Sequence, residues 1–346
     1  MASLRSRIRA DEALIDYSVV DSTAWAIVVR PGSIRSFALR ATSSQLATWV
    51  AAIRRPLVAT PGGRIDLAHA RFNVAAAESL YHALITPLRA ALGNAKSLAI
   101  APDGALWYVP FAALVTGRAN GRVSYLIERH EVRLLPSAQF LGRRDGNALP
   151  AGFRVDALSY SVPGGSAELA AIRSALGETR VASRDGAGAT ERATLSAQAH
   201  VLHLAVHASV DDRDPLASHL RLTPAGGDDG LLHLSEVASR RASPHLVVLT
   251  ACEAVSGRLY AGEGLVGLAR AFLMSGARLV IASGWPVAAS AAELTGVLYR
   301  EMAAGRSPPA ALRSAQLALI QKPETAHPIH WAGFVAFDGG AGNPPR

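Results

Sequence analysis

The chain of 346 residues contains a single cysteine, Cys252, and only two lysines, Lys96 and Lys322. One cysteine excludes a disulfide within the chain and a zinc site built from several cysteines. Aromatic residues make up 6% of the chain and charged residues 18%, whereas 50% of the residues are hydrophobic. Aliphatic side chains must therefore supply most of the core, and the composition predicts a packed globular protein rather than a disordered one.

Long apolar runs are also missing from the sequence. No uninterrupted hydrophobic stretch approaches the roughly 20 residues that a membrane-spanning helix needs. The N-terminus carries arginines, but Asp11 and Glu12 follow before any apolar region forms, so a secretory signal is not expected. These features predict a cytoplasmic protein with no membrane partner.

The formal net charge of +8 rests almost entirely on arginine. The arginines are scattered, and the closest groups are Arg5, Arg7 and Arg9 and the pairs at 143–144 and 240–241. No basic stripe alternates with aromatic residues, and no nucleic-acid-binding motif is present. Solvated surface arginine is the preferred interpretation, and nucleic acid is not an expected partner. A positive field can still speed association with acidic partners.

The second half of the sequence alternates apolar strands with helices. Strands are predicted at residues 155–160, 201–205, 246–250, 279–283 and 334–337, and helices at 166–176, 263–275, 289–304 and 308–320. Continuous apolar strands separated by helices predict an α/β fold whose mostly parallel sheet is covered on both faces.

The first half is predicted to open with strands at 13–20 and 25–29, followed by an amphipathic helix over 74–92 and a strand at 97–101. Pro87 is expected to kink or end that helix. The polar, turn-rich segment 142–152 is the best linker candidate. We therefore predict a first unit over residues 10–141 and a second over 153–340. The segments 142–152 and 183–189 are also candidates for self-cleavage or activation.

Two predicted strands lead into chemically reactive residues, since residues 201–205 precede His207 and residues 246–250 precede Cys252. Ligands of such sheets sit at the carboxyl ends of the strands. If the two strands are parallel neighbours, the imidazole and the thiol emerge side by side. A nucleophilic thiol needs a base about 3 Å away to take its proton and later return it to the leaving group. A lone cysteine is more often an inert core side chain, but loop-type residues follow Cys252.

Other patterns favour neither a metal nor a cofactor. His203 stands in the middle of its strand and is predicted to be a hydrogen-bonded core histidine, and no HExxH or CxxC pattern is present. Residues 262–267 match G-x-G-x-x-G, but they follow a polar loop, and no acidic residue ends the next strand. Nucleotide binding therefore remains an alternative to which we give less weight. These glycines are expected to let the loop after Cys252 turn into its helix.

The residues around both candidate positions resemble the CHAT family, caspase-like cysteine peptidases related to separase. The shared motifs are LHLAVH at 202–207, VLTACE at 248–253, GEGLVGLARAF at 262–272, WPV at 285–287, and HP at 327–328 followed by WAGF at 331–334. In the first half, PDG at 102–104 and VPFAAL at 109–114 also match. The resemblance covers roughly residues 10 to 338.

This resemblance implies a caspase-like sheet, with the first half as a structural pseudo-caspase unit packed against the catalytic half. It implies hydrolysis of peptide bonds by a Cys–His dyad without a cofactor or metal. Cys252 would attack the carbonyl, His207 would act as base and then acid, and the backbone N–H groups of Ala208 and Cys252 would hold the oxyanion. The implied partners are a protein substrate and a regulatory or sensor protein supplied separately, in a bacterial stress, defence or regulated-proteolysis pathway.

Three positions depart from the family motifs. Ala208 replaces the glycine after the histidine, at a cost of about 1 kcal/mol if that position needs a positive φ. Ala254 and Val255 replace Thr-Gly after Cys-Glu, and alanines replace the acidic residues that commonly follow Trp-Pro-Val. The last change weakens the expectation of a basic residue at the cleavage site. The candidates for the substrate pocket are Glu253, Glu263, Trp285, Ala288, Ala289 and Asp211. The acidic members are alternatively solvated or loop-capping carboxylates.

The sequence thus supports a cysteine endopeptidase first. The alternative is a catalytically silent CHAT scaffold that binds proteins, an interpretation that Ala208 favours.

Overall fold

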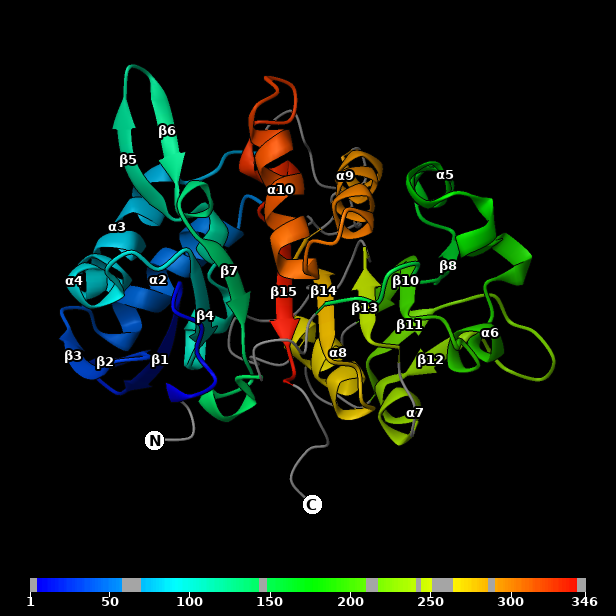
Figure 1. Ribbon diagram of the computed structural model, residues 1–346, viewed down its shortest axis with the longest axis horizontal. Helices are drawn as coiled ribbons and strands as arrows, with labels where there is room; N and C mark the ends of the chain where they lie inside the picture. Colours follow the sequence, from blue (N-terminus) through cyan, green and yellow to red (C-terminus); the bar gives the residue numbers. More distant parts are fainter. Residues whose placement is uncertain are drawn as a thin grey trace.

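The computed structural model describes residues 5–57, 70–142, 148–209, 217–240, 244–250, 264–285 and 290–340. In this part of the chain, one sheet contains 13 strands and a separate hairpin contains two. Figure 1 shows the strands side by side across the molecule, with those of the first half of the chain at one end and those of the second half at the other.

The first half contributes five strands to the sheet. β1 (Glu12–Val20), β2 (Thr23–Arg30) and β3 (Ser33–Leu39) form an antiparallel meander. β4 (Ser97–Ala101) lies parallel to β1, and β7 (Glu131–Leu134) lies parallel to β4. The separate hairpin is β5 (Val115–Ala119) with β6 (Arg122–Tyr125).

The helices of the first half are α2 (Ser43–Arg54), α3 (Val74–Leu84) and α4 (Arg89–Leu92). α2 begins with a capping box, in which Thr42 and Gln45 each accept a backbone N–H from the other. The predicted helix over 74–92 is interrupted where expected, because a 3-10 turn at Thr86–Leu88 contains Pro87. Proline lacks the N–H that continues a helix, so the chain starts a new short helix after it.

In the second half, four parallel strands form the centre of the sheet: β8 (Val155–Tyr160), β10 (Val201–Ser209), β13 (Leu246–Leu249) and β14 (Leu279–Ser283). β9 (Val181–Asp185) lies parallel to β8, and β15 (Phe334–Asp338) lies antiparallel to β14. β11 (His219–Arg221) and β12 (Leu231–His233) extend β10 antiparallel. The predicted α/β fold with a mostly parallel sheet is confirmed.

Helices cover this sheet on both sides. Figure 1 shows α5 (Gly165–Leu176), α9 (Ala291–Ala303) and α10 (Pro308–Ile320) on one side of the strands, and α7 (Leu234–Ser239) and α8 (Gly264–Met274) on the other. The short helix α6 (Glu191–Leu195) completes the set in the described ranges. Further 3-10 turns are Gly104–Tyr108, Phe111–Ala113, Leu126–Glu128, Ala138–Phe140, Glu178–Arg180, Gly186–Gly188 and Pro328–His330.

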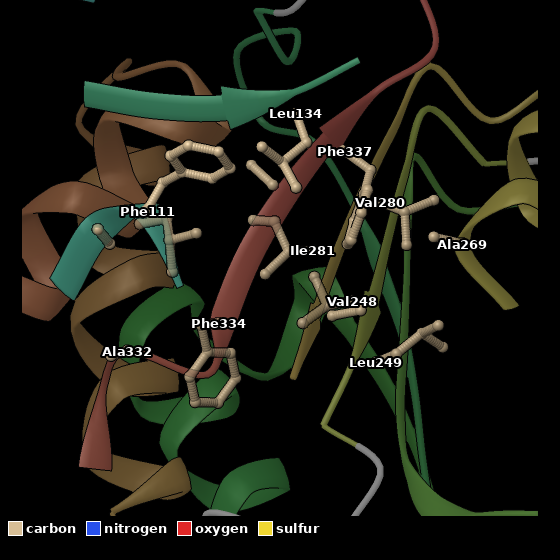
Figure 2. Close-up of a cluster of buried hydrophobic side chains, with 14 of the residues drawn as sticks. Phe111, Leu134, Val248, Leu249, Ala269, Val280, Ile281, Ala332, Phe334 and Phe337 are labelled. Atoms are coloured by element: carbon tan, nitrogen blue, oxygen red, sulfur yellow. The ribbon is translucent and has the colours of Figure 1, made fainter. Parts of the chain in front are cut away.

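The two halves share one sheet and one core. β15 pairs with β14 along its length and with β7 through Phe337 and Leu134. Figure 2 shows Phe111 and Leu134 of the first half packed with Ile281 and Phe337 of the second, and all four side chains are buried. β15 therefore joins the halves, and the boundary predicted at 142–152 separates segments that are continuous in space. The division into two units stays a prediction.

Candidate active site

His207 lies where β10 changes partners. β10 pairs with β8 up to Val206, opposite Tyr160, and from residue 207 it pairs with β11 instead. The sequence placed the end of this strand at residue 205. That boundary was wrong, because β11 prolongs the ladder to Ser209. His207 is nevertheless at the carboxyl edge of the parallel strands, where ligands of such sheets bind.

Ser161, the first residue after β8, orients the imidazole of His207. The Nε2 atom of His207 lies 2.8 Å from the carbonyl oxygen of Ser161. A carbonyl can only accept, so Nε2 carries the proton and Nδ1 keeps its lone pair. Nδ1 is buried and has no hydrogen-bond partner among the described residues. The nitrogen free to accept a proton at this site is therefore Nδ1.

The conformation of Ser161 makes this hydrogen bond possible. Ser161 has a φ of 58°, and it is one of three non-glycine residues with a positive φ in the described ranges. Such a conformation is unfavourable for a residue with a Cβ atom and turns the backbone sharply. Close behind it, Gly165 begins α5, where an added Cβ would come within 2.1 Å of the Ser159 hydroxyl oxygen. The tight turn between β8 and α5 thus depends on both residues.

β13, the strand that precedes Cys252, is the parallel neighbour of β10, which is the condition that the sequence analysis set for the two side chains to emerge at one edge. Four pairs, from Val201↔Leu246 to Leu204↔Leu249, define the register. The N–H of Thr250 then donates to the carbonyl of Leu204 at 3.1 Å. Six predicted site residues lie outside the described residues: Cys252, Glu253, Glu263, Asp211, Ala288 and Ala289.

Ala208 fits the strand without the cost considered for it. It is not among the described residues with a positive φ, and it pairs with Leu220 within the β10–β11 ladder. Backbone groups alternate along a strand. Val201 donates toward β8, through Arg154, and Leu204 accepts from the β13 side, so the N–H of Ala208 is directed to the β13 side. The N–H of Ala208 is thus on the side of the strand that precedes Cys252 in the sequence.

Trp285 supports the edge of the sheet from within. Its side chain is 3% exposed, and its indole N–H donates to the carbonyl of Ile329 at 2.9 Å. The ring packs on Gly333, where an added Cβ would lie 2.9 Å from indole Cε2. The Trp285 side chain is therefore part of the buried packing at this edge of the sheet.

Arg54 connects the first half of the chain to the same edge. Its Nη2 atom lies 3.5 Å from the carbonyl oxygen of Gly284, and its guanidinium lies 4.9 Å from the centre of the Tyr108 ring. Burial lowers the pKa of Arg54 to about 10, and the charge interaction with Tyr108 partly opposes this shift. A helix of the first half thus contacts the backbone next to Trp285.

His203 is a core histidine, as predicted. It is fully buried, with Nδ1 3.2 Å from the Tyr299 hydroxyl and Nε2 3.3 Å from Oε2 of Glu168. Burial, with a contribution from Glu168, raises the pKa of Tyr299 well above its usual value. These contacts fasten β10 to α5 and α9, four residues before His207.

A pocket of about 410 Å³ opens beside His207. It is lined by His207, Ala208, Ser209, His219, Arg221 and Leu231. The sequence analysis missed the last three residues, because they belong to strands of only three residues each. In the described ranges, no group of three or more His, Cys, Asp or Glu side chains could hold a metal, and no helix is long and apolar enough to cross a membrane.

Comparison with known proteins defines the class of this fold. The structure is similar to separase in the solved separase–securin complex of Saccharomyces cerevisiae, with a TM-score of 0.60. The match covers 97% of this chain and 30% of that chain, at 8% sequence identity, so it concerns the fold alone. The fold is that of caspase- and separase-like α/β proteins.

The CHAT domain model matches residues 74–338, and the chain belongs to the CHAT domain family. Among curated relatives, it is 25% identical over 383 residues to tetratricopeptide repeat protein 28 of Mus musculus and 24% identical to that of Homo sapiens. Each match covers 92% of this chain and 15% of the relative. The chain therefore spans only a small part of the length of these relatives.

Proposed function

We propose that the chain is a cysteine endopeptidase in which Cys252 is the nucleophile and His207 the base. The observation that carries this proposal is the register of β10 with β13. The two strands are parallel neighbours, so the residues that follow them leave the sheet at the same carboxyl edge. His207 lies at that edge, and in the sequence Cys252 follows the last residue of β13, Leu249, by three positions. This order of residues supports a thiol and an imidazole close enough for proton transfer.

The tautomer of His207 fits the two steps of such a reaction. Nδ1 takes the proton of the Cys252 thiol, while Nε2–H stays bonded to the Ser161 carbonyl, which stabilises the imidazolium. The thiolate attacks the peptide carbonyl, and the N–H of Ala208 donates to the oxyanion. Nδ1 then protonates the leaving amine as the C–N bond breaks. Water, activated by the same nitrogen, hydrolyses the thioester and restores the thiol.

The test is the pH dependence of Cys252 alkylation by iodoacetamide, in the wild type and in His207→Ala. The chain has one cysteine, so the signal has a single source. We expect an apparent thiol pKa clearly below about 8.5, the value of a free cysteine, and its return toward that value in His207→Ala. An ordinary pKa that His207→Ala leaves unchanged contradicts the dyad.

A catalytically silent CHAT scaffold is the second candidate. Ala208, which replaces the usual glycine, is the sequence feature behind this candidate, although Ala208 does not have a positive φ here. In such a scaffold, alkylation of Cys252 would show the pH dependence of a free cysteine. For the peptidase, we propose a protein substrate met in the cytoplasm and a regulatory or sensor protein supplied separately.

A further inference from the structure

The pocket beside His207 lies over one face of a three-stranded extension of the sheet. His207 pairs with Arg221, which pairs with Leu231 on β12. Cross-strand partners direct their side chains to the same face of a sheet. These three side chains therefore form a row that begins at the imidazole and leads away from it. His219, which pairs with Ser209 and with His233, lies on the same face.

The row extends on the side of β10 opposite to β13. β13 borders one side of β10, and β8 followed by β11 borders the other. A general acid must contact the leaving amine, so the part of the substrate that follows the scissile bond lies at His207. From there it continues away from the nucleophile, over β11. The pocket thus occupies the place of the first residue on the leaving side.

The chemistry of the pocket selects for a carboxylate. Arg221 forms no ion pair with any residue in the described ranges, and its guanidinium offers a planar set of donors that matches a carboxylate. Asp229, two residues before Leu231 in the sequence, accepts the backbone N–H of Leu231 at 2.9 Å and forms no ion pair with Arg221. Leu231 supplies an aliphatic wall for the stem of an entering side chain.

We propose that this pocket is a leaving-side subsite that takes Asp or Glu immediately after the scissile bond, with Arg221 as the residue that determines specificity. The proposal rests on the proposed peptidase function and names its substrate class. It assigns acidic selectivity to the β11–β12 extension, which the sequence analysis did not connect with the site.

Profiling of cleavage sites tests the subsite. Peptides from a denatured proteome are incubated with the enzyme, and the new N-termini are identified by mass spectrometry. We expect wild-type products to begin with Asp or Glu. Arg221→Gln should lose this preference, and Arg221→Glu should shift it toward Lys and Arg by about tenfold or more. Arg89→Glu, an equal charge reversal at an exposed residue of α4, is the matched control and should change nothing.

A binding measurement keeps the test independent of catalysis. The peptide amides Asp-Ala-Ala and Lys-Ala-Ala, which mimic leaving products, are titrated into Cys252→Ala by calorimetry. We expect the Asp peptide to bind about tenfold more tightly, with the order reversed in Arg221→Glu. Cleavage without a preference at this position overturns the subsite and leaves the peptidase standing. An ordinary Cys252 thiol pKa that His207→Ala leaves unchanged, together with an intact binding preference, overturns the peptidase alone. The same pKa result with equal binding of both peptides overturns both.

Discussion

The carbonyl oxygen of Ser161 lies 2.8 Å from Nε2 of His207, and Ser161 reaches this position only with a φ of 58°. Ser161 and His207 are 46 positions apart in the sequence, yet one hydrogen bond between them sets the tautomer of the proposed base. A change of backbone conformation at Ser161 must therefore act on His207 without touching either member of the proposed dyad.

Ser161→Pro should slow alkylation of Cys252 at neutral pH by about tenfold or more. Proline fixes φ near −65°, so the carbonyl cannot keep its direction and the imidazole loses its orientation. Ser161→Ala, which removes only the hydroxyl, is the matched control and should label at close to the wild-type rate. If the wild type, Ser161→Pro and Ser161→Ala were alkylated at equal rates, the Ser161 carbonyl would have no influence on the reactivity of the Cys252 thiol.

Gly333→Ala should lower the free energy of unfolding by about 1 to 3 kcal/mol, because overpacking a buried site forces its neighbours to move. The new Cβ would lie 2.9 Å from Cε2 and 3.0 Å from Nε1 of Trp285. Urea denaturation measures the loss. Gly117→Ala is the control, since a Cβ there meets nothing within 4 Å and φ is not positive. If both variants unfold at the same urea concentration, the indole is not confined by Gly333.

Acidification should destabilise the protein between about pH 6.5 and pH 4, and His245 should account for part of the loss. Burial, with Arg278 and His200 adding to it, lowers the pKa of His245 to about 4. Between that value and about 6.5, the unfolded chain binds a proton that the folded chain does not, so stability falls as the pH falls.

Unfolding midpoints of wild type and His245→Gln, measured from pH 7 to pH 4.5, check the role of His245. The variant should lose less stability on acidification than the wild type. His82→Gln, at an exposed histidine, is the control and should follow the wild type. If the stability of His245→Gln fell with pH as steeply as that of the wild type, His245 would not be the source of the loss.

Arg133→Met should cost about 3 to 5 kcal/mol of stability, because it removes the positive charge that faces several buried carboxylates. Arg133 lies 2.9 Å from Oδ2 of Asp338 and also pairs with Glu12, and all three side chains are almost fully buried. Burial opposes the charge of Arg133, but Asp338, Glu12 and Glu131 together raise its pKa.

Chemical denaturation of Arg133→Met measures this cost. The control is Arg118→Met, which removes a partly exposed ion pair. In the wild type, Arg118 lies 2.6 Å from the carboxylate of Glu78. That change should cost less than about 1 kcal/mol. Equal losses in the two variants would show that burial of the Arg133 cluster adds nothing to its importance.

The long apolar elements were predictable from the sequence because burial on both faces leaves a continuous apolar run. β8 and β14 were predicted at their observed bounds, and α10 likewise. The position of His207 at the edge of the sheet was predicted as well, whereas the pairing of β10 with β13 was only the condition for the dyad, and the structure meets it. Cys252 stays a prediction, and so does the reaction assigned to it.

The parts that were not predicted depend on short elements or on distant contacts. β11 and β12 have three residues each, too few for an alternating pattern, so the pocket around Arg221 had no signal. The positive φ of Ser161 belongs to a residue type that rarely adopts it. The contact of Arg133 with Asp338 joins residues 205 positions apart, and only the fold brings them together.

The late position of β15 in the sequence implies an order in which the sheet is assembled. β15 is the last strand of the sheet to leave the ribosome, and it lies between β14 and β7. When His207 and β13 have been synthesised but β15 has not, none of the described strands joins the sheet of the first half to that of the second. Arg133 also lacks its ion pair with Asp338, which lies on β15. The strands of the two halves become one continuous sheet when this strand inserts. Completion of the sheet, and with it of the ion-pair cluster around Arg133, therefore waits until β15 has been synthesised.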